Sequence, residues 1–166
     1  YILSGVSNPV IRAALLDTPL TYEDMEAIGT GLGTGGFMVF DDRTDPVDLA
    51  HAVSRFLWVE SCGQCPACKL GTGRITEILS GEGPRGGGTF AELSARLENV
   101  TDGARCFLPT QEQRLVHSLM ADMRVPELRT GDRGLLISKL LELRGDRFVL
   151  DARQALKQPD WTYAER

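Results

Sequence analysis

The stretch "ESCGQCPACK", residues 60–69, places three cysteines at three-residue intervals, and the chain has one more, Cys106. A helix turns about 100° per residue, so the first and third of these cysteines would stand roughly 120° apart on one. The segment therefore predicts a loop that curls around a centre. Gly63 lets the backbone turn closely, and Pro66 stiffens the turn.

The end of this loop predicts a favourable place for thiolates. We expect Cys68 to stand near the N-terminus of the next helix, where free N–H groups and the helix dipole favour negative charge. Cys106 falls between two later predicted helices, and a helical bundle would bring it back to the loop. The predicted ligand set is Cys62, Cys65, Cys68 and Cys106.

Three closely spaced cysteines with one remote cysteine favour a 4Fe–4S cluster, because its four irons take four thiolates and one tight loop can supply three. Structural zinc generally takes its ligands as two pairs, although zinc held by all four cysteines remains an alternative. A redox dithiol of Cys62 and Cys65 leaves the other two cysteines unexplained. Buried spectator thiols would not cluster.

Composition bounds the classes of function. The 166 residues are 42% hydrophobic, enough for a core without disulfides, and the net charge of −5 argues against nucleic acid or an anionic membrane surface as partner. No apolar run reaches the length of about 20 residues that a membrane helix needs. The chain opens at Tyr1 without a secretory leader. We expect a soluble cytoplasmic fragment of a longer polypeptide with no direct membrane insertion.

The N-terminal pattern predicts short strands at 1–11 and 37–40 around a helix that Thr21 caps and Gly29 ends. The segment "GTGLGTGG", residues 29–36, precedes a strand and opens no helix, so it fits neither a Walker loop nor a Rossmann fingerprint. It predicts close backbone packing instead.

Four helices are expected after residue 44. Asp45 and Pro46 begin the first, the second runs from Cys68 to about Gly81, and the capping boxes Thr89/Glu92 and Thr110/Gln113 open the third and fourth. The expected core positions are Val47, Ala50, Val53, Phe56, Leu57, Ile75, Ile78, Leu79, Phe90, Leu93, Leu97, Val100, Leu115, Leu119 and Met123. Such helices predict a small bundle.

Between the second and third of these helices, "GEGPRGGG", residues 81–88, predicts a surface linker. The last forty residues carry weaker signals. After Pro126, "RGLLISKLLEL" (134–144) predicts a helix, "RFVL" (147–150) a strand, and "QPDWTYAER" (158–166) a loose tail.

The cysteine stretch resembles the E-S-C-G-x-C-x-P-C-R signature of the NADH-binding flavoprotein (51 kDa-type) subunit of respiratory complex I and of its relatives in NAD-dependent formate dehydrogenases and bidirectional hydrogenases. "SGVSNPVI", "DTPLTYEDMEAIGTGLGTGGFMVFDD" and "DPVDLAHAVSRFLWVESCGQC" resemble the passage from that subunit's ubiquitin-like β-grasp domain into its cluster-binding bundle. Pro66 stands one position early, and Lys69 replaces the arginine.

The resemblance implies an α+β chain. Its parts would be the end of a β-grasp (SLBB-type) domain at 1–44, a four-helix bundle binding a 4Fe–4S cluster at 45–125, and a C-terminal extension at 126–166. Cys62, Cys65, Cys68 and Cys106 carry over as cluster ligands.

The implied function is electron relay from FMN, reduced by NADH, through one cluster to other subunits of an NAD-linked oxidoreductase such as NADH dehydrogenase (quinone). The FMN and NAD sites would lie on an upstream domain, so the chain would not be catalytic by itself. Partner subunits would hold it at the cytoplasmic face of the membrane. The alternative function is a structural four-cysteine zinc module for interactions.

Several other side chains near the cysteines have two interpretations. Lys69, Arg74 and Arg105 could raise the cluster's reduction potential or be ordinary surface bases. His51 and His117 fit helix packing or surface positions better than ligation. Trp58 and Phe56 could shield the centre from water or simply pack in the core.

Overall fold

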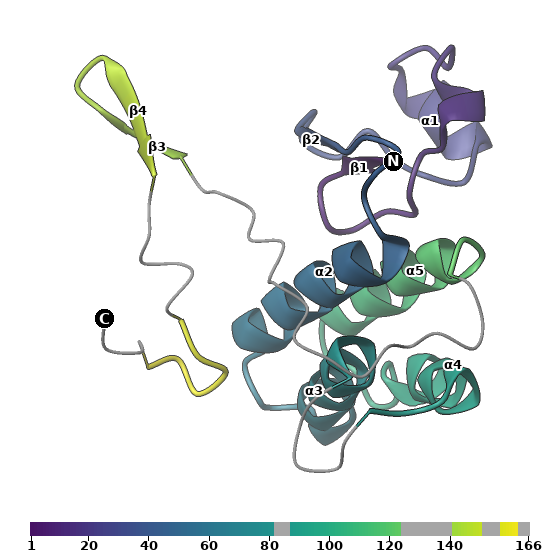
Figure 1. The fold of residues 1–166 in the computed structure, drawn as a ribbon, viewed down its shortest axis with the longest axis vertical. Helices are drawn as coiled ribbons and strands as arrows, with labels where there is room; N and C mark the ends of the chain where they lie inside the picture. Colours follow the sequence, from purple (N-terminus) through teal and green to yellow (C-terminus); the bar gives the residue numbers. More distant parts are fainter. Residues whose placement is uncertain (82–86, 124–140, 151–156, 163–166) are drawn as a thin grey trace.

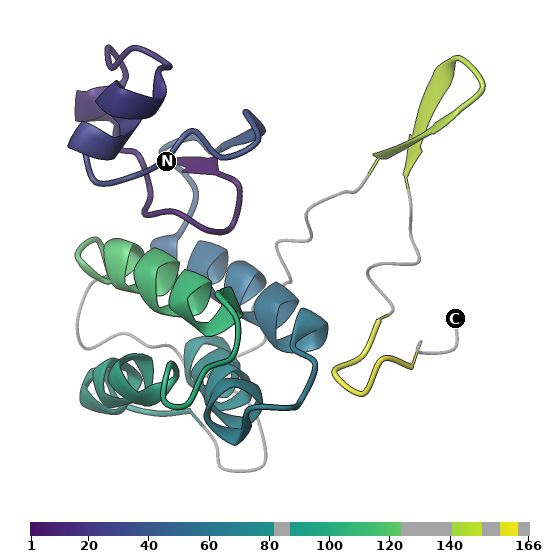
Figure 2. The ribbon, with the colours of Figure 1, turned by 180° about the vertical axis from the view of Figure 1, so that it is seen from behind.

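The computed structural model describes residues 1–81, 87–123, 141–150 and 157–162 (Figure 1). The fold is mixed α+β, as the sequence predicts: a small N-terminal unit lies against a group of helices (Figures 1 and 2). Most of the predicted linker at 81–88 and the start of the predicted helix at 134–144 lie outside the described residues.

The N-terminal unit is built on a two-stranded antiparallel sheet. Strand β1 (Ile2–Ser4) pairs with β2 (Phe37–Val39), with Ile2 opposite Val39. Between them lies α1 (Tyr22–Ala27), capped by the Thr21 side chain, which accepts from the backbone N–H of Asp24 at 3.1 Å. The strands and the capped helix confirm the sequence-based prediction.

The glycine-rich segment packs closely against the start of the chain. The Ser4 hydroxyl donates to the Leu32 carbonyl at 3.0 Å, and the Asn8 amide donates to the Gly31 carbonyl at 3.2 Å. A Cβ at Gly31 would stand 3.1 Å from the Asn8 amide oxygen, which explains glycine there. The predicted backbone packing is confirmed.

Polar bonds and shared apolar residues attach this unit to the last helix of the bundle, α5 (Leu108–Met120). The Val10 amide donates to the Ser118 hydroxyl at 2.9 Å, and the Arg12 guanidinium pairs with Asp122 at 2.8 Å. Leu3 and Val10 are buried in the same core as the helices. The two predicted regions therefore share one hydrophobic core.

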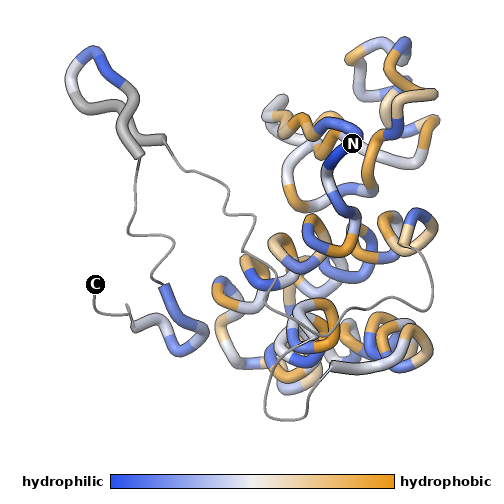
Figure 3. Tube along the Cα trace, in the orientation of Figure 1, coloured by the Kyte–Doolittle hydropathy of each residue, from blue (hydrophilic) through white to orange (hydrophobic). Residues whose placement is uncertain are grey.

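Four helices form the bundle: α2 (Pro46–Glu60), α3 (Pro66–Ser80), α4 (Phe90–Asn99) and α5. Helix α2 packs on α3 and α5, and α4 packs on α3 and α5. Along each helix apolar residues alternate with polar ones (Figure 3), and the apolar side faces inward. The fully buried side chains at its centre include Leu57, Ile75, Leu79, Leu97 and Leu115.

Three of the predicted helix boundaries are confirmed. The Asp45 carboxylate accepts from the Val47 amide at 2.7 Å and begins α2, and the Thr89 hydroxyl accepts from the Glu92 amide at 3.1 Å and begins α4. Gly81 ends α3 with φ 73°, a left-handed conformation that suits glycine.

Two predictions in the bundle are wrong. Helix α5 begins at Leu108, so Thr110 lies inside its first turn and caps nothing; Pro109 supplies a first-turn φ that suits an earlier start. The Gln113 amide instead donates to the Leu97 carbonyl at 2.7 Å. Phe56 is 44% exposed, because its position on α2 faces away from both neighbouring helices.

The C-terminal predictions are partly wrong. Residues 141–144 form strand β3 (Leu141–Arg144) where a helix was expected, and they pair antiparallel with β4 (Arg147–Leu150). Cross-strand pairing outweighs the helical spacing of leucines there. Of the tail expected to be loose, residues 158–162 belong to a turn bonded to the bundle, and 163–166 lie outside the described residues.

Candidate metal centre

Three of the four cysteines lie between the end of α2 and the first turn of α3. Helix α2 ends at Glu60, and α3 begins at Pro66 with Cys65 as its N-cap residue. Gly63 has φ 81°, which permits the tight turn. Cys62 is exposed, Cys65 is half-buried, and Cys68 is buried in the first turn of α3.

The fourth cysteine lies on the loop between α4 and α5. Backbone bonds from Asp102 to Asn99 and from Ala104 to Thr101, both 3.1 Å, shape this loop, and Gly103 adopts φ 64°. Cys106 follows directly and is exposed. Its predicted place between the last two helices is confirmed.

The thiol of Cys68 lies within electrostatic range of the other three. Its pKa is raised to about 11, first by burial, and then by the nearby thiols of Cys106, Cys65 and Cys62 and by Glu112. All four cysteines are free of disulfides. The bundle therefore directs four thiols toward one end of α3.

These thiols are not gathered as a single metal ion requires. Among the described side chains, no group of three or more Cys, His, Asp or Glu residues could hold one ion. Zinc bonds to sulfur of about 2.3 Å would need the sulfur atoms within roughly 4 Å of each other. In a 4Fe–4S cluster each of the four thiolates binds a different iron.

Comparison with known proteins agrees with this chemistry. Residues 48–125, which contain all four cysteines, match the family described as the NADH-ubiquinone oxidoreductase-F iron-sulfur binding region. The match covers 78 of the 166 residues, slightly less than half of the chain. It confirms the expected family and its iron–sulfur cofactor, while the individual ligands remain a proposal.

Curated relatives of the iron–sulfur binding region include the F subunits of NADH-quinone oxidoreductase from Rickettsia typhi and Rickettsia akari, each 36% identical over 78 residues. The corresponding protein of Rickettsia bellii is 37% identical over 79 residues. The match covers 47% of this chain but only 18% of the Rickettsia typhi protein and 19% of the Rickettsia bellii protein. The chain thus corresponds to less than a fifth of these relatives' length.

Lys69 follows Cys68 directly and is bonded to both sides of the cysteine loop. Its ammonium donates to the carbonyls of Trp58 at 2.9 Å, Ser61 at 3.0 Å and Pro159 at 2.7 Å. Burial lowers the pKa of Lys69, while the nearby Cys68 and Cys62 oppose that shift. Lys69 is therefore fixed beside the cysteine loop, and its effect on a reduction potential stays a prediction.

Arg74 and the two histidines have surroundings that differ from those of Lys69. Arg74 is buried and paired with Glu92 at 2.9 Å and Glu77 at 3.1 Å, so carboxylates offset its charge. His117 is exposed on α5, and His51 is buried in α2, consistent with surface and packing positions.

One buried carboxyl group was not predicted from the sequence. Glu112 of α5 is fully buried; its Oε1 accepts from the Ser54 hydroxyl at 2.6 Å, and that hydroxyl lies 2.9 Å from the Thr76 hydroxyl. Within the described residues, its Oε2 has no hydrogen-bond partner. Burial raises the pKa of Glu112 to about 8. Glu112 lies three and four residues before Leu115 and Val116, and this spacing could have indicated that it shares their buried helix face.

Trp58, which precedes the cysteine loop, packs against a glycine of α3. A Cβ built at Gly73 would stand 2.9 Å from the Trp58 indole nitrogen and 3.0 Å from Cε2. Glycine therefore lets the end of α2 approach α3 beside the cysteines. The predicted core packing of Trp58 is consistent with this contact.

We expect Gly73→Ala to destabilise the protein by about 1–3 kcal/mol, because the added methyl group displaces the indole ring. Urea unfolding monitored by circular dichroism measures the change. In a Trp58→Leu background the same substitution should be neutral or stabilising, since helix propensity then favours alanine by about 1 kcal/mol. Stabilisation in the wild-type background would contradict the close packing.

Proposed function

We propose that Cys62, Cys65, Cys68 and Cys106 bind one 4Fe–4S cluster, and that the chain relays single electrons between a flavin domain and a partner subunit. The observation that carries the proposal is the return of Cys106 to within electrostatic range of Cys68. A bound cluster supplies one-electron chemistry at a potential that its surroundings adjust.

The chain's residues would hold the cluster in distinct ways. Cys68 lies in the first turn of α3, where the free N–H groups and the dipole of a helix N-terminus would favour a negatively charged thiolate. Buried Cys68 would form the inner side of the site, and exposed Cys62 and Cys106 its outer side. An outer side of this kind suits electron exchange with a neighbouring protein surface.

The wider role rests on the names of the relatives. They are F subunits of NADH-quinone oxidoreductases, so we place FMN and NAD on an upstream domain and the electron acceptor on another subunit. We assign residues 1–44 to the end of a β-grasp domain, 45–125 to the cluster-binding bundle and 126–166 to an extension. None of the helices in the described ranges has the length and apolar character needed to cross a membrane.

Anaerobic reconstitution with iron and sulfide tests the ligand assignment. We expect about four irons and four sulfides per chain, a brown colour that dithionite bleaches, and an electron paramagnetic resonance signal of the reduced cluster. A colourless protein that binds stoichiometric zinc through the same four cysteines would favour the structural zinc module instead.

We also expect the 166-residue chain by itself not to oxidise NADH, because hydride transfer requires the flavin and its nucleotide site. Anaerobic mixing of the reconstituted chain with NADH and ferricyanide measures this. Dithionite reduction of the same sample is the control that the cluster is redox-active. Steady NADH turnover by the chain would overturn the proposed division of roles.

A further inference from the structure

The C-terminal end of α2 is capped by groups from three parts of the chain. The last four carbonyls of a helix have no partner within it. The Ser61 amide donates to the carbonyls of Leu57 at 2.9 Å and Trp58 at 3.3 Å. The carbonyl of Trp58 also accepts from Lys69, and that of Val59 accepts from the Trp161 indole at 2.7 Å.

Residues 157–162 form a compact turn. The Gln158 amide donates to the Thr162 carbonyl at 2.8 Å, and the Trp161 amide donates to the Gln158 carbonyl at 2.9 Å. The Asp160 carboxylate accepts from the amide and hydroxyl of Thr162. Trp161 has φ 67°, a left-handed conformation that is costly for a bulky residue and persists only where surrounding contacts impose it.

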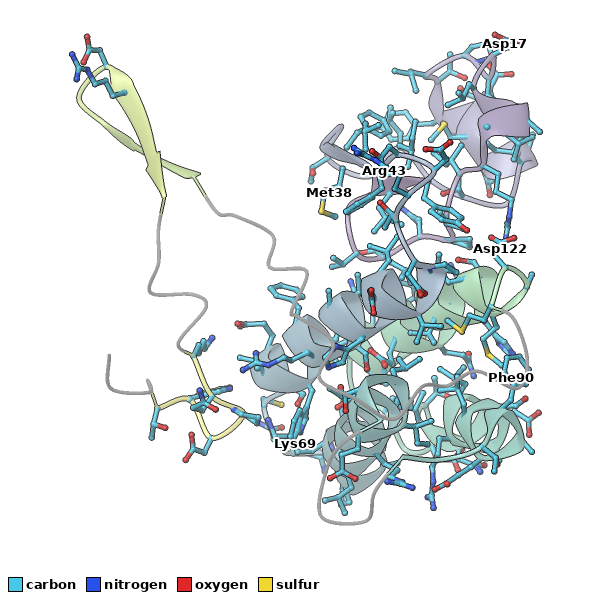
Figure 4. All side chains as sticks on the ribbon, viewed as in Figure 1. Asp17, Met38, Arg43, Lys69, Phe90 and Asp122 are labelled. Carbon is cyan, nitrogen blue, oxygen red and sulfur yellow. The ribbon has the colours of Figure 1, made fainter. Side chains whose placement is uncertain are left out.

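Several polar contacts hold the turn against α2 and Lys69. The Pro159 carbonyl accepts from Lys69 at 2.7 Å, the Trp161 indole donates to Val59, and Lys157 pairs with Glu60 at 2.6 Å. Figure 4 shows Lys69 where the C-terminal segment meets the end of α2, far from Arg43 among the N-terminal strands. Helix α2, the cysteine loop and the tail thus meet at one ammonium group.

We propose that residues 157–162, the C-terminal strap, act with Lys69 as a positioning device for the cysteine loop and keep one positive charge beside the cluster. The proposal rests on the proposed function, since it assumes that the loop binds a cluster. Lys69 follows Cys68 directly, and two of its three acceptors lie on α2 and at Ser61, on the other side of the loop.

The strap has an energetic reason to hold Lys69 in place. A lysine side chain loses rotamer freedom when it is fixed, so an isolated surface lysine would move away. A third acceptor on Pro159, together with the negative end of the α2 dipole, favours the bound position. A cation held there favours the more negative, reduced state of the cluster and thus raises the reduction potential.

The first test needs no cluster. In the cluster-free chain, hydrogen exchange of the Trp161 indole N–H is followed by nuclear magnetic resonance, with Trp58→Phe to assign the two indole signals. We expect Lys69→Met to raise the exchange rate several-fold, Lys69→Arg to preserve it, and Arg43→Met, a matched loss of one charge, to leave it unchanged. Equal exchange in wild type and Lys69→Met overturns the strap.

The second test uses the reconstituted chain. We expect Lys69→Met to lower the midpoint potential, and Lys69→Arg to stay close to wild type. Arg43→Met is again the control. Trp161→Ala and a chain ending at residue 156 should lose iron to a chelator several-fold faster. Potentials and iron-loss rates equal to wild type in all these variants overturn the proposal.

The two tests separate the strap from the proposed function. If the wild-type chain assembles no cluster, the cysteine assignment fails, while the exchange experiment still decides whether Lys69 and residues 157–162 act together. If the cluster assembles and requires all four cysteines, but neither exchange nor potential responds to Lys69→Met, the cysteine assignment stands and the strap is wrong.

Discussion

Replacement of Cys106 by alanine is expected to leave a site with three thiolates and one iron without a protein ligand. Such an iron is easily lost, so anaerobic reconstitution should yield a three-iron or unstable cluster by electron paramagnetic resonance. Alanine at Cys62, Cys65 or Cys68 removes a ligand from the tight loop itself. Those variants should assemble little or no cluster.

The position of Cys106 makes its alanine variant informative beside the variants of the other three cysteines. Cys106 is exposed on a loop with its own backbone bonds, so its loss should leave the helices intact. Arg105→Ala, one residue away, is the matched control and should retain the wild-type cluster. If Cys106→Ala gives an unaltered four-iron signal with wild-type stability, the fourth ligand lies elsewhere. The exposed His117 lies on α5 beyond Cys106, so ligation by it would require that helix to unwind.

Glu112→Gln is expected to change how the stability of the protein depends on pH. Burial raises the pKa of Glu112 from its ordinary value of 4.5 to about 8. Between these values the unfolded chain releases the proton and the folded chain keeps it, so the free energy of unfolding falls as pH rises. At 1.36 kcal/mol per pKa unit, the loss is on the order of 5 kcal/mol.

The groups around Glu112 determine how stability is expected to depend on pH. Ser54 on α2 donates its hydroxyl to the carboxyl group, Thr76 on α3 lies within hydrogen-bond distance of that hydroxyl, and Cys68 on α3 is the nearby thiol. Glutamine keeps the shape of the protonated acid and cannot ionise. Its stability should match wild type near pH 4.5 and exceed it increasingly toward pH 8, where the wild-type loss levels off.

Urea unfolding of wild type and Glu112→Gln from pH 4.5 to 9 measures this difference, because contributions from other titrating groups cancel between the two proteins. Glu98→Gln, at an exposed position of α4, is the matched control and should follow wild type at every pH. Parallel profiles for wild type and Glu112→Gln would contradict a proton held in the core.

Local signals in the sequence were sufficient for much of this protein. Asp45 and Thr89 cap helices through bonds to residues two or three positions away, and Gly81 ends one through its own backbone conformation. The cysteine spacing is equally local, since Gly63 permits the turn within the loop and Pro66 begins α3 at its end. These features depend on neighbours in the chain, so the sequence alone could predict them.

The tertiary structure decided what depends on distant partners. The place of Glu112 inside the bundle depends on the Ser54 hydroxyl of α2, which in turn contacts the Thr76 hydroxyl of α3, whereas a charged residue on a helix otherwise predicts a solvated face. The segment around Trp161 has no periodic pattern, because its partners are carbonyls at the end of α2 and the ammonium of Lys69. Backbone carbonyls are the same in every residue, so only the packed helix end could show what the tail binds.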